Sequence, residues 1–545
     1  MFATPQATAR YHERFPGYYR SVLGRTGLAV SGAGFGGYRV SAGIPSHGAA
    51  LEAALRSGVN LVDTSANYAD GGSERLIGET IARLVAEGSI ARQEIVVVTK
   101  GGYIQGSNYA MARERVEAGS GFLEVVEYAE GLWHCISPEF LEDQITRSLD
   151  RLAMPGIDLY LLHNPEYYLS WAAKHRMPLD EARAEYYRRI RNAFEYLESE
   201  VERGRIAWYG ISSNSIPHAA RDPDFTSLEE CVRIAEMRSL IHHFAAVQLP
   251  ANLVERGFVT EQNQSGGRTA IAYAREKNLG VLINRPLNAI TGSGLVRLAD
   301  FPSANQPFNE GDVQPLIMRA MELEEHFRRD ILPGLGLDAE AHETVAECAT
   351  IGGVLDEHWQ SFGGIERYND LLAQVFAPRL NLLARLFGAG DARDGEDAEE
   401  TGGEVREWSG EYLPAVRELL RVVGLYYARS AQRRSDRMRA QLHRDLRNAW
   451  SAGGASVEGA ATNGEAAALR NEAAALRNEV AALRNEAAAT PAGTLSSLAI
   501  RMLLGVEGVD TVLVGMRRLD YVEDVLAALA AGPLGGEAAW RAGAV

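Results

Sequence analysis

Short apolar runs rich in β-branched residues alternate with helix-like segments along most of the chain, and this alternation is the feature that most limits the fold. Such runs have the length and composition of strands. Eight of them are found, at 29–34, 60–63, 94–99, 157–162, 206–211, 245–249, 280–284 and 510–514. Between them, apolar residues recur every three to four positions, as in the stripes Leu141, Ile145, Leu149, Leu152 and Tyr186, Ile190, Phe194, Leu197, Val201. We interpret these stripes as the buried faces of helices.

The alternation of strand and helix predicts an α/β protein, and eight repeats are the number in a (β/α)8 or TIM barrel. In that fold the catalytic groups lie at the C-terminal ends of the strands. Asp63, Lys100 and His163 each come at or just after such an end. The sequence therefore predicts that an acid, a base and an imidazole face one mouth of the barrel.

The stretch LVDTSANYADGGSE, residues 61–74, adds a phenol to this group, because Tyr68 follows Asp63 in a glycine-rich turn. A carboxylate or a phenol needs water or a partner when it is buried. Loops that a rigid scaffold positions often carry function. We therefore expect Asp63 and Tyr68 to be two members of a catalytic group.

The regular spacing is interrupted once, after the seventh run. We expect the barrel to occupy 21–295 and 493–532, with a mainly α-helical insertion, 296–492, between strand seven and helix seven. Helical periodicity in the insertion is found at 315–330, 338–350, 366–388 and 411–450. An insertion in this βα connection emerges on the active-site face, where it is either a lid over the pocket or a peripheral domain.

Three segments of the insertion have a biased composition. Residues 465–490 repeat every seven positions, with mostly alanine at one apolar position and leucine at the other. Alanine buries little surface, so we favour an exposed helix or a spacer over a coiled coil. We interpret the acidic segment 391–400 as a solvated loop. The arginines of 429–447 lack interleaved aromatic residues, so we expect them to pair with that loop or with helix neighbours rather than with nucleic acid.

Charge and cysteine content exclude several classes of protein. A net charge of -17 argues against binding of nucleic acid or of an anionic membrane. No signal peptide and no membrane-spanning run is recognised, so we expect a cytoplasmic protein. The cysteines Cys135, Cys231 and Cys348 lack the paired spacings of zinc sites, and we expect neither a metal site nor disulfide bonds.

Seven motifs follow one another in an order that resembles the aldo-keto reductase superfamily, which are NADP-dependent TIM barrels that reduce aldehydes and ketones. The motifs are RTGLAVSGAGFGGYR, VDTSANYADGGSERLIG, IVVVTKGGY, IDLYLLHNPE, AWYGISSNS, AVQLPANLVE and VLVGMRR. The resemblance covers 21–295 and 493–532. It implies interconversion of a small carbonyl compound and an alcohol with NADP(H), or with NAD(H) as the alternative.

The resemblance also implies a role for each member of the catalytic group. Reduction of a carbonyl needs a proton as well as a hydride, and Tyr68 matches the family's general acid. Lys100 matches the lysine that lowers the pKa of the phenol, which is about 10 when unperturbed. Asp63 would hold that lysine, and His163 would donate a hydrogen bond to the substrate oxygen.

Most cofactor positions follow from the resemblance as well. The turn after strand one contributes Gly36, Gly37 and Tyr38. Ser212 and Gln248 match residues that hold the nicotinamide carboxamide. Either Ser213 or Asn214 supplies the neighbouring amide contact. For each position, ordinary turn chemistry is the alternative explanation.

Two cofactor segments depart from the family pattern. An aromatic residue that commonly stacks on the nicotinamide is replaced by Asn284, which precedes Arg285, Pro286 and Leu287. After the last strand, a Pro-Lys-Ser motif is replaced by Val514, Gly515 and Met516, followed by Arg517 and Arg518. These two arginines stand beside a helix start and either bind the 2′-phosphate of NADP or are surface charges.

One rival function remains open beside the oxidoreductase. The same barrel serves equally as a non-catalytic regulatory subunit that binds a nicotinamide nucleotide and uses the helical insertion to bind a partner. An isomerase or a metal-dependent aldolase fits less well, because acids and histidines do not cluster at successive strand ends.

Overall fold

The computed structural model describes residues 2–292, 294–387, 396–455, 493–535 and 540. The chain divides into two compact units, one formed by 1–298 with 440–545 and the other by 299–439. The predicted boundaries at 295/296 and 492/493 stay predictions, because residues 456–492 are not described. The heptad-like repeat at 465–490 also lies outside the described residues.

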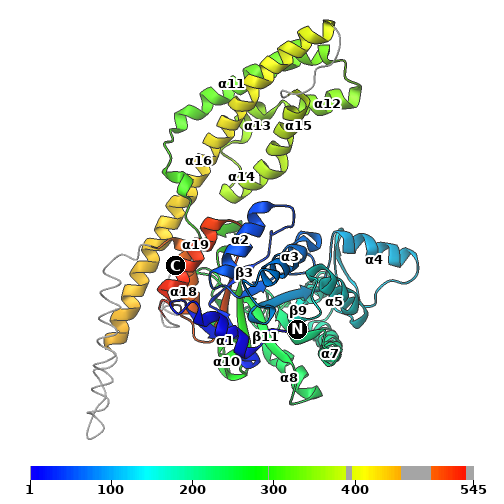
Figure 1. The fold of residues 1–545 in the computed structure, drawn as a ribbon, viewed down its shortest axis with the longest axis vertical. Coiled ribbons are helices and arrows are strands. Elements are labelled where there is room, and N and C mark those ends of the chain that lie inside the picture. The colour runs from blue at the N-terminus through cyan, green and yellow to red at the C-terminus, as the bar shows by residue number, and fades with distance from the viewer. Residues whose placement is uncertain (1, 293, 388–395, 456–492, 536–539, 541–545) are drawn as a thin grey trace. The chain divides into compact units, whose positions relative to one another are not determined.

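The first unit is a closed barrel of eight parallel strands, as predicted (Figure 1). Around the barrel the strand order is β10, β11, β12, β15, β3, β4, β5 and β9. The strands span Ala33–Gly36 (β3), Leu61–Asp63 (β4), Val96–Gly101 (β5), Ile157–His163 (β9), Ile206–Ser212 (β10), Phe244–Pro250 (β11), Gly280–Asn284 (β12) and Thr511–Val514 (β15). Because all neighbours are parallel, the C-terminal ends of the strands meet at one end of the barrel.

The predicted first strand, 29–34, is in fact two strands. Ala29–Ser31 (β2) pairs antiparallel with Arg20–Val22 (β1), and only β3 enters the barrel. Side chains of this hairpin, such as Leu23 and Val30, join the core inside the barrel with inward residues of the parallel strands. The hairpin thus packs apolar side chains against the barrel interior. This explains why the hairpin residues are as apolar as those of a barrel strand.

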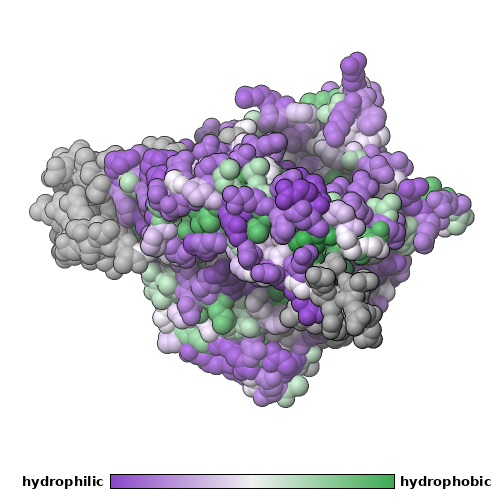
Figure 2. Space-filling view, turned by 90° about the horizontal axis from the view of Figure 1, so that it is seen from above, coloured by the Kyte–Doolittle hydropathy of each residue, from purple (hydrophilic) through white to green (hydrophobic). Residues whose placement is uncertain are grey.

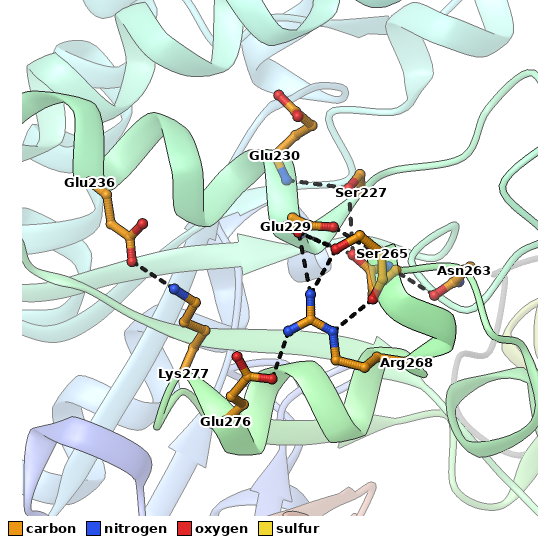
Figure 3. A network of polar contacts seen from close by, with 10 residues as sticks. Ser227, Glu229, Glu230, Glu236, Asn263, Ser265, Arg268, Glu276 and Lys277 are labelled. Carbon is orange, nitrogen blue, oxygen red and sulfur yellow. Dashed lines mark hydrogen bonds and ion pairs between the residues drawn. The ribbon is translucent and has the colours of Figure 1, made fainter.

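Helices surround the barrel, and the predicted stripes are their buried faces. The main ones are α1 (Pro5–Glu13), α2 (Pro45–Arg56), α3 (Gly72–Ala86), α5 (Pro138–Leu152), α7 (Leu179–Glu202), α8 (Leu228–Arg238), α10 (Ala270–Glu276), α18 (Leu495–Leu504) and α19 (Leu519–Ala531). Of the nine stripe residues, only Leu149 and Val201 are half-buried rather than buried. Polar contacts join α8 to α10, including an ion pair of 3.0 Å between Lys277 and Glu236 (Figure 3).

A long excursion between β5 and α5 escaped prediction. It contains α4 (Ser107–Glu117) and a small sheet of β6 (Tyr103–Ile104), β7 (Val126–Ala129) and β8 (Leu132–His134). Strands of two to four residues are too short to show a period in the sequence. The excursion leaves the C-terminal end of β5, so it lies where the catalytic groups are expected.

The second unit is helical and has its own apolar core. Its helices are α11 (Val313–His326), α12 (Ala339–Cys348), α13 (Ile351–His358), α14 (Ile365–Leu371), α15 (Ala377–Phe387) and most of α16 (Glu396–Ala455). Two π-helical segments, η7 (Phe327–Ile331) and η9 (Leu372–Phe376), continue α11 and α14. All four segments predicted to be helical are confirmed. In the chain this unit lies between β12 and α18.

In the insertion, the acidic segment differs from the expectation, and the arginines agree with it in part. Residues 396–400 of the expected acidic loop begin α16, because glutamate and alanine favour helix and acids are stabilised at a helix N-terminus. Arg429 donates to the carbonyl oxygens of Ala304 and Gln306, and Arg439 pairs with Asp300. These two arginines therefore hold the start of the unit, and Arg439 also pairs with its helix neighbour Asp436 at 4.0 Å, which is one of the two expected alternatives.

The visible surface in Figure 2 is largely hydrophilic, with small hydrophobic areas between polar side chains. Within the described residues, no helix has the length and apolar character needed to cross a membrane.

Candidate active site

A buried ion pair joins the ends of β4 and β5. The Nζ atom of Lys100 donates to Oδ2 of Asp63 and to the carbonyl oxygen of Thr64, both at 2.7 Å. Lys100 is 0% exposed. Burial raises the pKa of Asp63 and lowers the pKa of Lys100, while the attraction between the two opposes both changes. The second carboxylate oxygen accepts from Gln248 at 2.8 Å, so both oxygens of the buried carboxylate are hydrogen-bonded.

Tyr68 lies directly beside this pair. Its ring centroid is 5.0 Å from Nζ of Lys100, and it begins a short turn, Tyr68–Gly71, in which Ala69 and Asp70 have left-handed φ angles of 50° and 52°. The ring of Tyr38, which is 61% exposed, packs edge-on at 5.3 Å. The turn thus brings a half-buried phenol to the lysine, as the sequence predicts.

The pKa of Tyr68 differs from the expectation. Burial raises it well above the ordinary value, and Asp63 and Tyr38 raise it further. The expected lowering by Lys100 is absent because the Asp63 carboxylate offsets the charge of the ammonium group. The phenol is therefore protonated at neutral pH, which is the state that a proton donor requires.

His163 completes the group at the end of β9. Its ring packs edge-on against Tyr68 at 5.9 Å, and its Nδ1 lies 2.9 Å from Oγ of Ser65. Burial and the charge of Lys100 hold the pKa of His163 well below its usual value, so the imidazole is neutral. The single hydroxyl proton of Ser65 has three acceptors, Nδ1, the side chain of Asn67 and the Lys100 carbonyl. When it goes to Nδ1, the ring proton is on Nε2.

The excursion after β5 contributes residues that the sequence did not reveal. The Tyr103 ring packs edge-on against His163 at 4.7 Å, and its hydroxyl accepts from Asn164 at 2.7 Å. Nε2 of His134 donates to the carbonyl oxygen of His163 at 2.7 Å. Tyr167 packs against Tyr103 at 5.2 Å. The only signal in the sequence was a concentration of aromatic residues just after strand ends.

Ser212 and Gln248, which are expected to hold the nicotinamide carboxamide, form one chain of polar contacts with Asn284. Oγ of Ser212 donates to Oε1 of Gln248 at 3.0 Å, and Nδ2 of Asn284 lies 3.5 Å from the same oxygen. Oδ1 of Asn284 is buried and has no hydrogen-bond partner among the described residues. The Ser213 hydroxyl bonds to Ser215 and Thr226, whereas the Asn214 side chain makes no such bond within the described part of the chain. An unpaired amide oxygen in this place fits the NH₂ group of a carboxamide.

The glycines of the first turn have a packing explanation. A Cβ on Gly36 would lie 3.2 Å from the carbonyl of Val514, and one on Gly37 would lie 2.8 Å from the oxygen of Asp63. The backbone N–H of Gly37 donates to that oxygen at 2.7 Å. Both positions therefore require close approach of neighbouring backbone, whether or not a cofactor binds.

The two departures from the family pattern lie at the ends of β12 and β15. Arg285 has a left-handed φ of 53° and pairs with Glu255 at 2.9 Å, while Pro286 and Leu287 are buried. Nε of Arg285 is buried without a hydrogen bond to the described residues.

Gly515 is exposed and Met516 is buried. Arg517 and Arg518 directly precede α19, and Arg518 pairs with Asp520 at 2.6 Å. The positive end of a helix and the guanidinium groups beside it fit an anionic nucleotide.

Comparisons with known proteins agree with this geometry. Residues 35–297 match the model of the Aldo/keto reductase family. An NADH-specific methylglyoxal reductase of Escherichia coli (strain K12) is 31% identical over 150 residues, which is 26% of this chain and 40% of the relative. A D-threo-aldose 1-dehydrogenase of Pseudomonas sp is 27% identical over 234 residues, 41% of this chain and 63% of the relative.

Solved structures that resemble this chain include aldo/keto reductases. One is an aldo/keto reductase from Klebsiella pneumoniae in complex with NADP and acetate, at 19% identity and a TM-score of 0.30, covering 49% of this chain and 68% of that one. The chain spans 40% and 63% of the two curated relatives named above. The stretch 35–297, which holds six of the eight barrel strands, the end of β3 and the four grouped side chains, belongs to the aldo/keto reductase family.

Proposed function

We propose that this protein is an NAD(P)H-dependent oxidoreductase that interconverts an aldehyde or ketone and an alcohol. The observation that carries the proposal is the placement of the Tyr68 ring 5.0 Å from a fully buried lysine whose charge is held by Asp63. A neutral histidine packs edge-on against the same ring at 5.9 Å. This is the set of groups that proton transfer to a carbonyl oxygen needs.

Each residue has one task in the proposed reaction. The nicotinamide, when bound, supplies the hydride to the carbonyl carbon. The Tyr68 hydroxyl gives its proton to the oxygen as the C=O double bond becomes an alcohol. The ammonium group of Lys100, 5.0 Å from the ring centroid, lies beside the phenolate that remains until water returns the proton. Nε2 of His163 donates a hydrogen bond to the substrate oxygen and orients it.

Asn284 and Asn214 are proposed to hold the carboxamide, in place of the Gln248 that the sequence suggested. The side-chain oxygen of Gln248 already accepts from Ser212, and its NH₂ group already donates to Asp63. Arg517 and Arg518 are proposed to bind the cofactor phosphate at the start of α19, so NADP(H) is favoured. NAD(H) remains the alternative, and one relative is named as NADH-specific. A cytoplasmic location stays a prediction.

The decisive experiment is oxidation of NADPH and NADH by the purified chain against a carbonyl panel that includes methylglyoxal and aldoses. Tyr68→Phe should lower kcat by about 10²- to 10⁴-fold, the usual contribution of a general acid, and leave cofactor affinity nearly unchanged. Turnover by Tyr68→Phe at the original rate would refute the role of the phenol.

The second candidate, a regulatory subunit that binds a nicotinamide nucleotide, is favoured by one observation. The helical unit has its own core, as a partner-binding element would. Nucleotide binding without turnover of any carbonyl in the panel would favour this function.

A further inference from the structure

The helical unit contains two cavities of similar size that differ in charge. The first cavity has a volume of about 370 Å³ and the second about 320 Å³. The first is lined by Val354, His358, Ser361, Phe362, Arg367, Leu371, Val375 and Phe376. Volumes of this size are typical of sites that bind small organic molecules.

The apolar wall of the first cavity is held in place by its own contacts. The N–H of Phe362 donates to the hydroxyl of Tyr427 at 3.0 Å, and that hydroxyl donates to the carbonyl of Trp359 at 2.7 Å. The Phe362 ring also packs 6.4 Å from that of Phe376, which is fully buried. The wall is therefore formed before any ligand arrives.

Two of the lining residues, Val375 and Phe376, belong to the π-helical segment η9. A π-helix is wider than an α-helix and is found mostly as single turns, often at functional sites. Here it directly follows α14 (Ile365–Leu371; Figure 1). Leu371 and Arg367 of α14 also line the cavity. The segment thus brings side chains from two kinds of helix to one cavity.

The charge at the first cavity is not neutralised. Among the residues that the structure describes, Arg367 has neither an ion pair nor a side-chain hydrogen bond, and it is exposed. In the second cavity Arg421 is bound by both oxygens of Glu418, at 2.6 and 2.7 Å. An arginine guanidinium beside an apolar pocket is matched by a carboxylate with an apolar body.

We propose that the first cavity binds a small apolar carboxylate. The apolar part lies among Val354, Phe362, Leu371, Val375 and Phe376, and the carboxylate binds the guanidinium of Arg367. This site is independent of the reaction proposed for the barrel, because all its residues belong to the helical unit.

Isothermal titration calorimetry of the full chain with octanoate tests the proposal. Octanoate should bind with one site per chain, and 1-octanol, which has the same chain length, should bind about 10- to 100-fold more weakly, as the loss of a charged hydrogen bond requires. Arg367→Gln should weaken octanoate to the level of the alcohol. The matched variant Arg421→Gln, at the second cavity, should leave octanoate binding unchanged.

Val375→Trp fills the first cavity and should abolish binding without lowering the melting temperature. If that variant does not fold, the pair Arg367→Gln and Arg421→Gln decides the question. The proposal is overturned if octanoate does not bind, if it binds no better than octanol, or if the two arginine variants behave alike.

Discussion

The barrel and the helical unit both bury a glutamate, and they satisfy it differently. Glu324 of the helical unit, 3% exposed, accepts from the N–H groups of Gly352 and Gly353 and from the Tyr412 hydroxyl. Glu166 of the barrel, 6% exposed, accepts the N–H of Asn214, while its Oε2 has no partner among the described residues. Both oxygens of Glu324 are engaged in structural hydrogen bonds, whereas one oxygen of Glu166 can still accept a hydrogen bond near the site.

The same contrast holds for buried cations. Lys100 is buried in the barrel, and its pairing leaves the neighbouring Tyr68 hydroxyl and Nε2 of His163 available for a substrate. In the helical unit Arg429 holds backbone and Arg439 pairs with Asp300, while others, such as Arg367, stay exposed. The buried Lys100–Asp63 pair thus stands at the reaction site, whereas another buried carboxylate of the barrel, Glu74 with Arg151, is structural, as Glu324 is in the helical unit.

The largest effect is expected from breaking the buried pair. Lys100→Met leaves the charge of Asp63 without its cation, and should lower the free energy of unfolding by about 3–5 kcal/mol and abolish turnover. Lys277→Met is the matched control, because its pair with Glu236 is at the surface and is worth at most about 1 kcal/mol. Urea unfolding and the carbonyl assay measure the two quantities.

A double variant separates stability from chemistry. Lys100→Met with Asp63→Asn removes both charges, so much of the lost stability should return while turnover stays lost. If turnover returns along with stability, the pair is only structural, and the contrast between the two units fails.

A second effect is a pH dependence of stability that originates in Glu166. Burial raises its pKa to about 7, from an ordinary value of 4.5. Between these values the folded state holds the proton more tightly, so stability is largest below about pH 4.5 and declines up to about pH 7, by at most about 3 kcal/mol. Glu166→Gln should flatten this slope in urea unfolding.

Glu185→Gln serves as the control for that slope. Its neighbour Arg188 lowers the pKa of Glu185 to about 2, so the stability it contributes is present above its unfolded pKa and is lost only in acid. The slope between about pH 4.5 and 7 should therefore be unchanged in this variant. An unchanged slope in Glu166→Gln as well would assign the pH dependence to other groups.

A third, smaller effect is expected in the helical unit. Glu324→Gln puts an NH₂ group against at least one N–H donor and should cost about 1–3 kcal/mol. Hydrogen exchange should rise in peptides from 339–387, while turnover in the carbonyl assay stays the same. Glu322→Gln, an exposed neighbour, is the control. A loss of turnover in Glu324→Gln would mean that the helical unit takes part in the reaction.

Much of the barrel follows from the sequence because its signals are local. Each parallel strand is a short apolar run, and Asp63, Lys100 and His163 follow directly from the ends of β4, β5 and β9. The excursion after β5 cannot be predicted from the sequence, because its strands are only two to four residues long. Its contacts with His163 come from Tyr103 and His134, whose spacing along the chain carries no period.

The pKa of Tyr68 was missed for a related reason. The sequence indicates which charges are near, but the net effect depends on burial and on the exact pairing of Lys100 with Asp63. Ser65 was overlooked because a serine in a turn has many ordinary uses. Only the fold shows that its hydroxyl reaches Nδ1 of His163, at 2.9 Å.

The smallest predicted effect tests whether Ser65 sets the tautomer of His163. Ser65→Ala removes one hydrogen bond, worth about 0.5–1.5 kcal/mol, so kcat should fall by about 2- to 10-fold. Ser65→Thr keeps the hydroxyl and should retain most of the rate, and Ser148→Ala, a buried serine of α5, controls for packing. Equal rates for Ser65→Ala and Ser148→Ala would mean that the neutral imidazole presents its proton on Nε2 without this hydroxyl. The Nε2 proton that His163 offers to a substrate would then depend on the burial of the imidazole alone.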